Sequence, residues 1–246
     1  MEVRKTEFTV EEARCVAYRV EKRAEKRAGE RPEALILQPV DRREIEALDA
    51  QVESEIQLSG RAFAHVAFEV ESWNRDLSPW EAPAVFGKEG FGSGAAQTLE
   101  RIKEKLIPAI IEKKLTESSV PVIIGGYSLA GLFALWCSYQ TRVFHSVAAV
   151  SPSVWFPRWL EFAKANRTKA QHVYLSLGDK EAKTKNVTMA KVSDCITEMQ
   201  RLLTEEKVDN TLQWNSGNHF TEPDLRCARG FSWCLRKSGQ GASVSF

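Results

Sequence analysis

One segment near the middle of the chain constrains the fold more than any other. Residues 120–124 (Val-Pro-Val-Ile-Ile) form an apolar run typical of a buried parallel strand, and residues 132–136 (Leu-Phe-Ala-Leu-Trp) are typical of a buried helix. The turn between them is built from small residues around Ser128, with Gly126 two positions before it and Ala130 two after it. Such a strand, sharp turn and helix are typical of a nucleophile elbow. The pattern predicts a serine hydroxyl above the sheet edge, beside the N-terminal amides of the helix.

The motif alone leaves an alternative open. Its last position is Ala130, where the G-x-S-x-G pattern has glycine. A tight strand-to-helix turn that merely contains a serine would look the same. The remainder of the chain must therefore supply partners for Ser128 before any chemistry can be inferred.

Composition excludes several classes of protein. The chain has 246 residues, of which 43% are hydrophobic, and a formal net charge of +1. This length fits one α/β domain or two small ones, and the small net charge gives no support for a nucleic-acid or membrane partner. No apolar run approaches the roughly 20 residues that span a bilayer, and residues 1–7 lack the apolar core of a signal peptide. We therefore expect a cytoplasmic protein.

The five cysteines indicate reduced thiols. Their number is odd, and no pair has a metal-ligand spacing such as C-x-x-C. We expect neither disulfides nor a metal site.

Strand and helix patterns alternate along the chain without repeats. Apolar runs predict strands at 34–38, 63–70, 120–124, 146–151, 172–177 and 211–214. Helical patterns cover 41–58, 95–114, 132–136, 159–165, 187–206 and 223–235, and the first begins with Asp41 and Glu44 in a capping-box arrangement. The alternation predicts an α/β fold with a mostly parallel sheet and helices on both faces. No domain boundary is evident, so we expect a single domain over residues 1–246.

The two ends of the chain are less regular. Within residues 1–33, either residues 15–20 form an early strand or residues 11–30 form one charged helix, and both alternatives stay open. Residues 237–246 are rich in Gly and Ser and are expected to be a flexible tail.

A serine nucleophile needs a base, normally histidine. His65, His145 and His172 lie in or beside predicted strands and are interpreted as core or surface residues. His219 instead follows the last strand, in a Gly/Asn loop at the carboxyl end of the sheet, where open α/β sheets place their chemistry. It is the predicted base, and the alternative is a loop histidine that caps a helix.

The base in turn needs a carboxylate to orient it. In the α/β-hydrolase order of Ser, acid and His, the turn after residues 172–177 offers Asp179 and Glu181. Glu181 is favoured because it lies three positions after Gly178, an offset that hydrolases of this fold often use, and Asp179 is the second choice. A solvated charged turn with no catalytic part is the alternative.

An oxyanion hole needs two preorganised amides. The first predicted donor is the amide of Leu129, directly after the nucleophile. The second should come from the loop after residues 34–38, where Pro39 has no N–H. Val40 is the first choice there and Asp41 the second.

At this point the chain resembles a known family. Residues 125–135, 151–155, 175–181 and 214–220 resemble the α/β-hydrolase superfamily, and within it the esterase group that includes esterase D and the enterochelin esterases. Residues 76–80, inside the segment 73–80, resemble a block of small predicted hydrolases of that group. The resemblance covers residues 34–236 and implies an α/β-hydrolase fold without a large cap domain, and ester hydrolysis with no cofactor.

Three departures from the family pattern matter. Ala130 replaces the usual glycine of the elbow. Residues 38–41 read Gln-Pro-Val-Asp instead of the family's frequent Asp-Gly. The region before residue 34 is short and charged, so the sheet is expected to lack a leading strand.

These observations predict a serine hydrolase that cleaves carboxylic esters of a small molecule through an acyl-enzyme. An acyltransferase with the same triad, and a non-catalytic binding protein on the same scaffold, are the alternatives. Arg75 and Asn74 are predicted substrate contacts, because their loop follows a strand beside the elbow strand; an Arg75–Asp76 ion pair that pins the loop is the other interpretation.

Aromatic residues complete the predicted site. Trp155 and Tyr127 are predicted to contact the substrate. Trp73, Trp80 and Trp155 are interpreted either as walls of an apolar acyl pocket or as aromatic residues that bury their loops.

Overall fold

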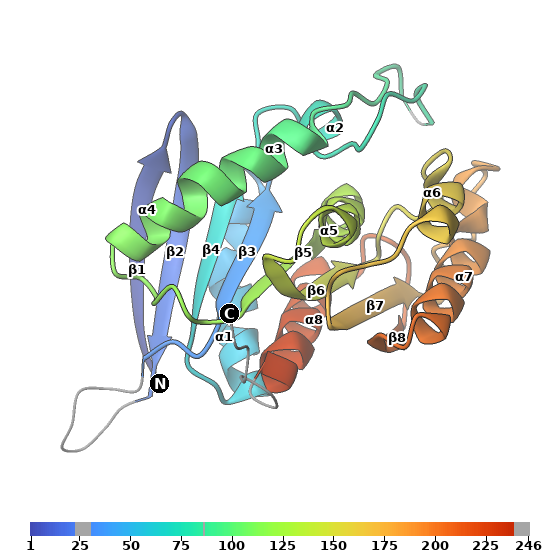
Figure 1. Cartoon of the computed structure of the whole chain (residues 1–246). Helices are drawn as coiled ribbons and strands as arrows, with labels where there is room; N and C mark the ends of the chain where they lie inside the picture. The colour runs from blue at the N-terminus through green and yellow to red at the C-terminus, as the bar shows by residue number, and fades with distance from the viewer. Residues whose placement is uncertain (23–30, 86, 239–246) are drawn as a thin grey trace.

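The computed structural model describes residues 1–22, 31–85 and 87–238. Their strands form one sheet with the order β1-β2-β4-β3-β5-β6-β7-β8 (Figure 1). The strands are β1 (Glu2–Val10), β2 (Ala13–Glu21), β3 (Leu35–Val40), β4 (Phe63–Glu69), β5 (Val122–Tyr127), β6 (Phe144–Val150), β7 (His172–Gly178) and β8 (Asp209–Asn215). β2 pairs antiparallel with β1 and β4, and all other pairs are parallel. The predicted mostly parallel sheet is confirmed, and the single domain stays a prediction.

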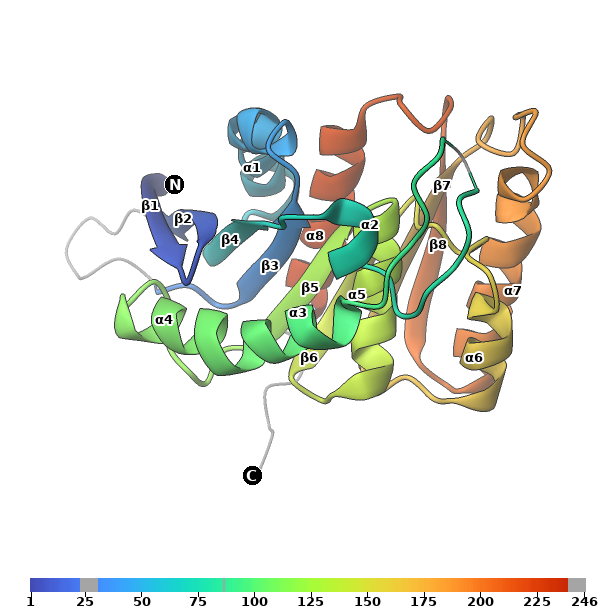
Figure 2. The ribbon, with the colours of Figure 1, turned by 90° about the horizontal axis from the view of Figure 1, so that it is seen from above.

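Helices cover both faces of the sheet, as predicted (Figure 2). On one face lie α1 (Glu44–Ser59) and α8 (Pro223–Ser238), which pack against each other. On the other lie α3 (Ala95–Arg101), α4 (Ile107–Glu112), α5 (Leu129–Gln140), α6 (Trp159–Ala165) and α7 (Val192–Glu205). A π-helical turn (Ile102–Leu106) joins α3 to α4, a 3-10 turn (Met189–Lys191) precedes α7, and the short α2 (Trp73–Asp76) follows β4. The predicted helices are thus all present; α6 has its predicted bounds, and the others have shifted ends.

The central strands are buried because helices cover both of their faces. β3 is buried at every position, and only the first residue of β5 is half-buried. Such strands carry continuous β-branched and other apolar residues, which is why their sequence lacks alternation. Eleven of the twelve residues of α5 are also buried, so the elbow lies between two elements with little freedom to move.

The N-terminal region differs from one of its two predictions. Residues 15–20 lie in β2, so the strand alternative is confirmed and the helix alternative is wrong over residues 11–22; residues 23–30 lie outside the described residues. The expected lack of a leading strand is also wrong, because β1 and β2 form an antiparallel hairpin. β1 is a mostly exposed edge strand, and its charges, such as Glu7 paired with Arg14, are typical of edges protected from further pairing.

β3 runs two residues beyond its predicted end at Gln38. The last residue of β3 paired with β5 is Leu37, whereas pairing with β4 continues to Val40. The carbonyl of Val40 accepts a hydrogen bond from Val70 N, so Val40 faces β4 and Pro39 faces the side that β5 has already left. The missing N–H of Pro39 therefore interrupts no ladder.

The C-terminal prediction needs a small correction. Residues 237 and 238 belong to α8, and the rest of the predicted tail, residues 239–246, lies outside the described residues. All five cysteines are free in this structure. Within the described ranges, no helix combines the length and the hydropathy needed to cross a membrane.

Candidate active site

Ser128 occupies a strained turn between β5 and α5. Its φ is +57° and its ψ is −117°, a backbone conformation that non-glycine residues rarely adopt. Ser128 N donates to Val150 O of the neighbouring strand β6 at 3.0 Å. A Cβ added to Gly126 would lie only 2.6 Å from the Cβ of Ala130. The elbow accepts alanine at its last position because glycine stands opposite, and the turn carries the strain typical of functional sites.

Two loops bring the predicted partners to Ser128. His219 lies between β8 and α8, and its Nε2 is 3.1 Å from Ser128 Oγ. Its Nδ1 is 2.7 Å from Oε2 of Glu181, which lies three residues past the end of β7. With the carboxylate as acceptor, Nδ1 carries the proton and Nε2 is free to accept from the serine hydroxyl. The three predicted residues thus form one hydrogen-bonded chain.

Glu181 is buried and heavily hydrogen-bonded. Its Oε1 accepts from Ser151 Oγ at 2.7 Å, from Gly178 N at 2.7 Å and from Arg226 Nη1 at 3.0 Å. Burial alone would raise the pKa of Glu181, but interactions with His219, Ser151 and the Gly178 amide outweigh it and lower the pKa. The carboxylate is therefore ionised at neutral pH and faces the imidazole with a fixed orientation.

Asp179, the second choice for the acid, does another job. Its Oδ1 accepts from Gly217 N at 2.8 Å, and its own amide donates to Asn215 O at 2.8 Å. Asp179 thus holds the backbone of the His219 loop, whereas Glu181 contacts the imidazole itself.

The other three histidines make their side-chain contacts with residues other than Ser128. His65 is fully buried beside Glu55, and His172 pairs with Asp209. His145 contacts Ser146 Oγ. Each is a core or surface histidine, in agreement with the prediction.

The predicted oxyanion donors differ in their availability. Leu129 is the first residue of α5, where backbone N–H groups have no partner within the helix. Val40 faces β4, as its carbonyl bond to Val70 shows, so its amide points to that strand as well. The Asp41 amide donates to Glu44 Oε2 at 2.9 Å in the predicted capping box. Neither choice for the second donor is therefore a free amide, because β3 runs past Pro39 and the capping box takes the next N–H.

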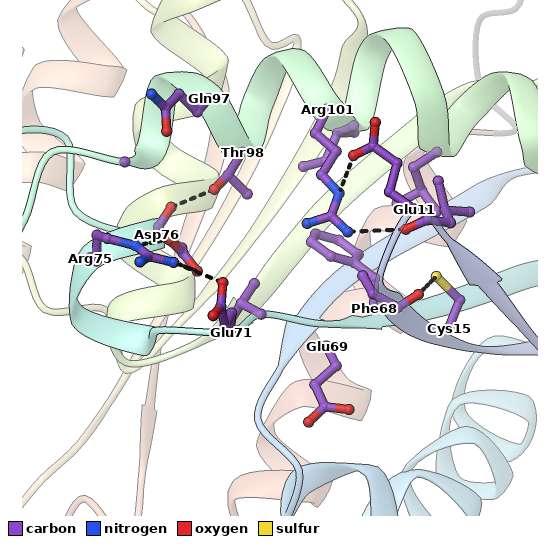
Figure 3. A pocket seen from close by; sticks show the side chains of 16 residues that line it. Glu11, Cys15, Phe68, Glu69, Glu71, Arg75, Asp76, Gln97, Thr98 and Arg101 are labelled. Carbon is purple, nitrogen blue, oxygen red and sulfur yellow. Dashed lines mark hydrogen bonds and ion pairs between the residues drawn. The ribbon is translucent and has the colours of Figure 1, made fainter.

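Arg75 lies in the ion pair that was the alternative interpretation. Its Nε is 2.7 Å from Asp76 Oδ1, and its Nη2 is 3.1 Å from Glu71 Oε2. These residues line a cavity of about 310 Å³ between α3 and the β1–β2 hairpin, with Arg101 and Cys15 on its other walls (Figure 3). Ser128, His219 and Glu181 are not among the residues that line this cavity. For Asn74, the other predicted substrate contact, the backbone carbonyl accepts a hydrogen bond from Gly92 N.

Trp80 and Trp155 make different contacts. Trp80 Nε1 donates to Pro157 O at 2.9 Å, and its ring packs on Phe156 and Phe162, so it fastens its loop to α6. Trp155 is half-buried and follows Ser153, whose Oγ lies 3.3 Å from Ser128 Oγ. Trp155 is therefore the tryptophan whose own loop contacts the nucleophile.

The hydroxyl of Tyr127, a predicted substrate contact, is bonded within the protein. Its OH donates to His219 O at 2.7 Å and accepts from Arg226 Nη1 at 3.2 Å. Its ring centroid lies 5.1 Å from that of His219. In this structure Tyr127 supports the histidine loop.

Three residues of the site were absent from the sequence prediction: Ser151, Ser153 and Arg226. Ser151 also has a positive φ, 44°, and like Ser128 it follows directly on a central strand. Arg226 lies on the buried face of α8 with Cys227, Gly230 and Phe231. An arginine on the apolar face of an amphipathic helix was the available signal. Among the described residues, no group of three His, Cys, Asp or Glu side chains is arranged to hold a metal ion.

Comparisons with known proteins identify the family and the fold of the chain. The model of the family described as Putative esterase matches residues 46–221, a range that contains Ser128, Glu181 and His219. The comparison with curated proteins gave no match.

Solved structures with the same fold have low sequence identity. An IroE-like serine hydrolase from Shewanella oneidensis has a TM-score of 0.71 at 14% identity, covering 96% of this chain and 80% of that one. The siderophore hydrolase EstA from Aspergillus nidulans has a TM-score of 0.70 at 15% identity, with coverages of 96% and 95%. The enterobactin esterase FES from Shigella flexneri has a TM-score of 0.62 at 15% identity; the match covers 95% of this chain and 60% of that one.

Proposed function

The chain belongs to the Putative esterase family and is an ester-hydrolysing serine hydrolase of the α/β-hydrolase fold, and from that premise we propose that Ser128, His219 and Glu181 are its catalytic triad. The observation that carries the proposal is the hydrogen-bonded chain from Ser128 Oγ through His219 to Glu181, at 3.1 and 2.7 Å. The strained φ of Ser128 supports it.

The proposed reaction has two halves. His219 Nε2 takes the Ser128 proton as the oxygen attacks the ester carbonyl, and then gives it to the departing alcohol, which leaves an acyl-enzyme. Water, deprotonated by the same nitrogen, attacks the acyl carbonyl; the bond to Ser128 Oγ then breaks, the acid is released and His219 returns the proton to the serine oxygen. Glu181 holds Nδ1–H and stabilises the imidazolium in both halves. The Leu129 amide, at the positive end of α5, binds the oxyanion.

The proposed substrate is a small-molecule carboxylic ester. Trp155 is the proposed aromatic wall, because its loop contacts the nucleophile through Ser153. Three different proteins among the structural neighbours are described as siderophore hydrolases or as an enterobactin esterase, so enterobactin belongs in the substrate panel beside simple esters.

A fluorophosphonate probe tests the nucleophile directly. We expect covalent labelling of the wild-type chain at Ser128 and none of Ser128→Ala, together with a loss of about 10⁶-fold in kcat on short- and long-acyl aryl esters. Ser153→Ala is the matched control, because it removes the neighbouring hydroxyl and should keep the label. A folded wild-type chain that takes no label would exclude a serine esterase and favour a binding protein. Faster product formation with an added alcohol or thiol than with water would indicate an acyltransferase.

A further inference from the structure

A single arginine lies behind the proposed triad. Arg226, in the first turn of α8, is fully buried, and its partner Glu181 exposes only 3% of its side chain. Nη1 lies 3.0 Å from Glu181 Oε1, on the carboxylate oxygen opposite the one that holds His219. The carboxylate is thus shared between a buried cation and the imidazole.

The same guanidinium also reaches the histidine loop. Nη2 donates to Ser216 O at 3.0 Å, and Nη1 donates to Tyr127 OH at 3.2 Å. Tyr127 OH in turn donates to His219 O at 2.7 Å. Arg226 therefore connects the strand end that carries the acid with the loop that carries the base.

The backbone is shaped around this side chain. A Cβ added to Gly178 would lie 3.0 Å from both Nη atoms of Arg226 and 2.5 Å from Gly217 O. Glycine at the end of β7 thus allows the close approach of the His219 loop backbone and leaves room for the guanidinium beside it. Lysine would offer a compact point charge in place of this planar fork.

We propose that Arg226 is a positioning residue of the active site that acts through Glu181, orienting the carboxylate and offsetting part of its charge where it faces His219. The inference rests on the proposed triad. Without the cation, the full carboxylate charge would act on the imidazole and favour its protonated form. Arg226 thereby lowers the net negative charge that faces the His219 ring.

Other charged or titratable groups around the pair leave this argument unchanged. Burial raises the pKa of Tyr127 to about 12 and that of the Cys227 thiol well above its usual value, so both are neutral. Asp179 is exposed and bound to Gly217 N. Glu44, Glu55 and Asp224 are the charged groups that act on the neighbouring Cys227, and Arg229 lies one turn further along α8. None of these contacts either the Glu181 carboxylate or the His219 ring within the described chain.

The test compares Arg226→Met with Arg229→Met, which removes a half-buried arginine one turn later on α8. Arg229 donates to Asn215 Oδ1 and contacts no proposed triad residue. We expect Arg226→Met to lower kcat per labelled active site about 100-fold and to move the low-pH limb of kcat/KM upward by about one pH unit. Arg229→Met should leave both unchanged. A 100-fold loss without movement of the limb would contradict the electrostatic part of the proposal.

A double variant tests whether Arg226 acts through Glu181. In a Glu181→Gln background, the additional Arg226→Met change should lower kcat less than threefold, because the charge it offsets is already gone. A full 100-fold further loss would overturn the proposal. The double variant also removes the unpaired buried carboxylate, so it should fold even where Arg226→Met alone does not.

The Arg226→Lys variant provides a third comparison. It keeps the charge but not the fork, so kcat should fall while the low-pH limb stays in place. Loss of activity in Ser128→Ala and His219→Ala beside wild-type behaviour of Arg226→Met would refute this inference alone. Persistence of activity in Ser128→Ala would instead refute the proposed triad.

Discussion

Helix α8 lies against two buried pairs of an acidic and a basic side chain, and the two pairs differ in their surroundings. Near the start of α8, Arg226 contacts Glu181, and Glu181 contacts His219, whose side chain is 26% exposed. His219 in turn contacts Ser128. Further along the chain, Ser232 donates to the carbonyl of Glu55, whose carboxylate is 2.9 Å from His65 Nδ1. Both pairs lie in the apolar interior of the α1 and α8 face.

The second pair, Glu55 and His65, is connected only to other buried side chains among the contacts found in the described chain. Glu55 and His65 are completely buried, and Gln51 connects Glu55 to Gln38 through bonds of 2.9 and 2.7 Å. His65 Nε2 has no partner in the described chain. Burial of an acidic side chain beside a basic one is therefore common to both pairs, whereas only the first pair connects to a half-exposed nucleophile. Burial of such a pair therefore does not identify a candidate site by itself. The distinguishing feature is a chain of hydrogen bonds from the buried carboxylate to a solvent-accessible reactive atom.

The first prediction removes the acid of the first pair. Glu181→Gln should lower kcat about 10⁴-fold, because the imidazole loses its orienting charge and its tautomer. Asp179→Asn is the control and should change kcat less than severalfold, since its oxygen can still accept from Gly217 N. Steady-state kinetics on an aryl ester measure both. Should only Asp179→Asn abolish turnover, the assignment of the acid would be wrong.

The second prediction removes the acid of the second pair. Glu55→Ala leaves His65 and Gln51 without their buried partner, so the free energy of unfolding should fall by about 3–5 kcal/mol. Glu53→Ala, an exposed position of the same helix, should have little effect. Urea unfolding measures the loss, and kcat per labelled active site should stay within twofold of wild type. A folded Glu55→Ala variant without activity would remove the distinction between the two pairs.

Local sequence signals were sufficient for the residues that line the reactive side of the site. Ser128 lies in a strand–turn–helix whose glycine and alanine spacing is a local steric requirement, and Gly126 meets Ala130 in the structure. Glu181 and His219 each follow a strand by a short offset, and parallel strands bring their carboxyl ends to one edge. Order and spacing therefore predicted their meeting.

Residues that act through long-range contacts were not predictable in this way. Arg226 comes from a helix whose register toward β7 depends on packing with α1 and the sheet. The direction of the Val40 amide depends on β4, which continues to pair after β5 has diverged. The β1–β2 hairpin was ambiguous because β1 is mostly exposed and charged, and apolar alternation appears only where one face of a strand is buried.

The third prediction concerns a half-buried carboxylate without a cation. Glu44 accepts from the Asp41 amide, and no positive side chain lies within ion-pair distance in the described part of the chain. Burial, with a smaller contribution from the Asp41 charge, raises the pKa of Glu44 to about 7, against the lowering effect of the amide bond. Since the unfolded chain releases this proton at lower pH, the native state is destabilised as pH rises from about 4.5 to 7.

Glu44→Gln should remove this pH dependence. The variant should gain stability over wild type by up to about 3 kcal/mol at pH 8 and show little gain at pH 4. Urea unfolding at the two pH values measures the difference. An equal effect at both would show that the carboxylate is already solvated or paired, and Glu44 would then resemble Glu181 rather than contrast with it.

The smallest expected effect comes from an ion-pair cluster in solvent. On α7, Arg201 contacts both Glu198 and Glu205, and Lys164 of α6 lies 2.9 Å from Glu198. Interactions with Arg201 and Lys164 lower the pKa of Glu198 to about 2, yet water screens these charges and the long side chains lose freedom when they pair. Arg201→Met should therefore leave the midpoint of urea unfolding unchanged within error, at low and at high salt. A salt-dependent loss approaching that of Glu55→Ala would mean that burial is not what separates strong pairs from weak ones, and the contrast between the core pairs and the surface would have to rest on geometry alone.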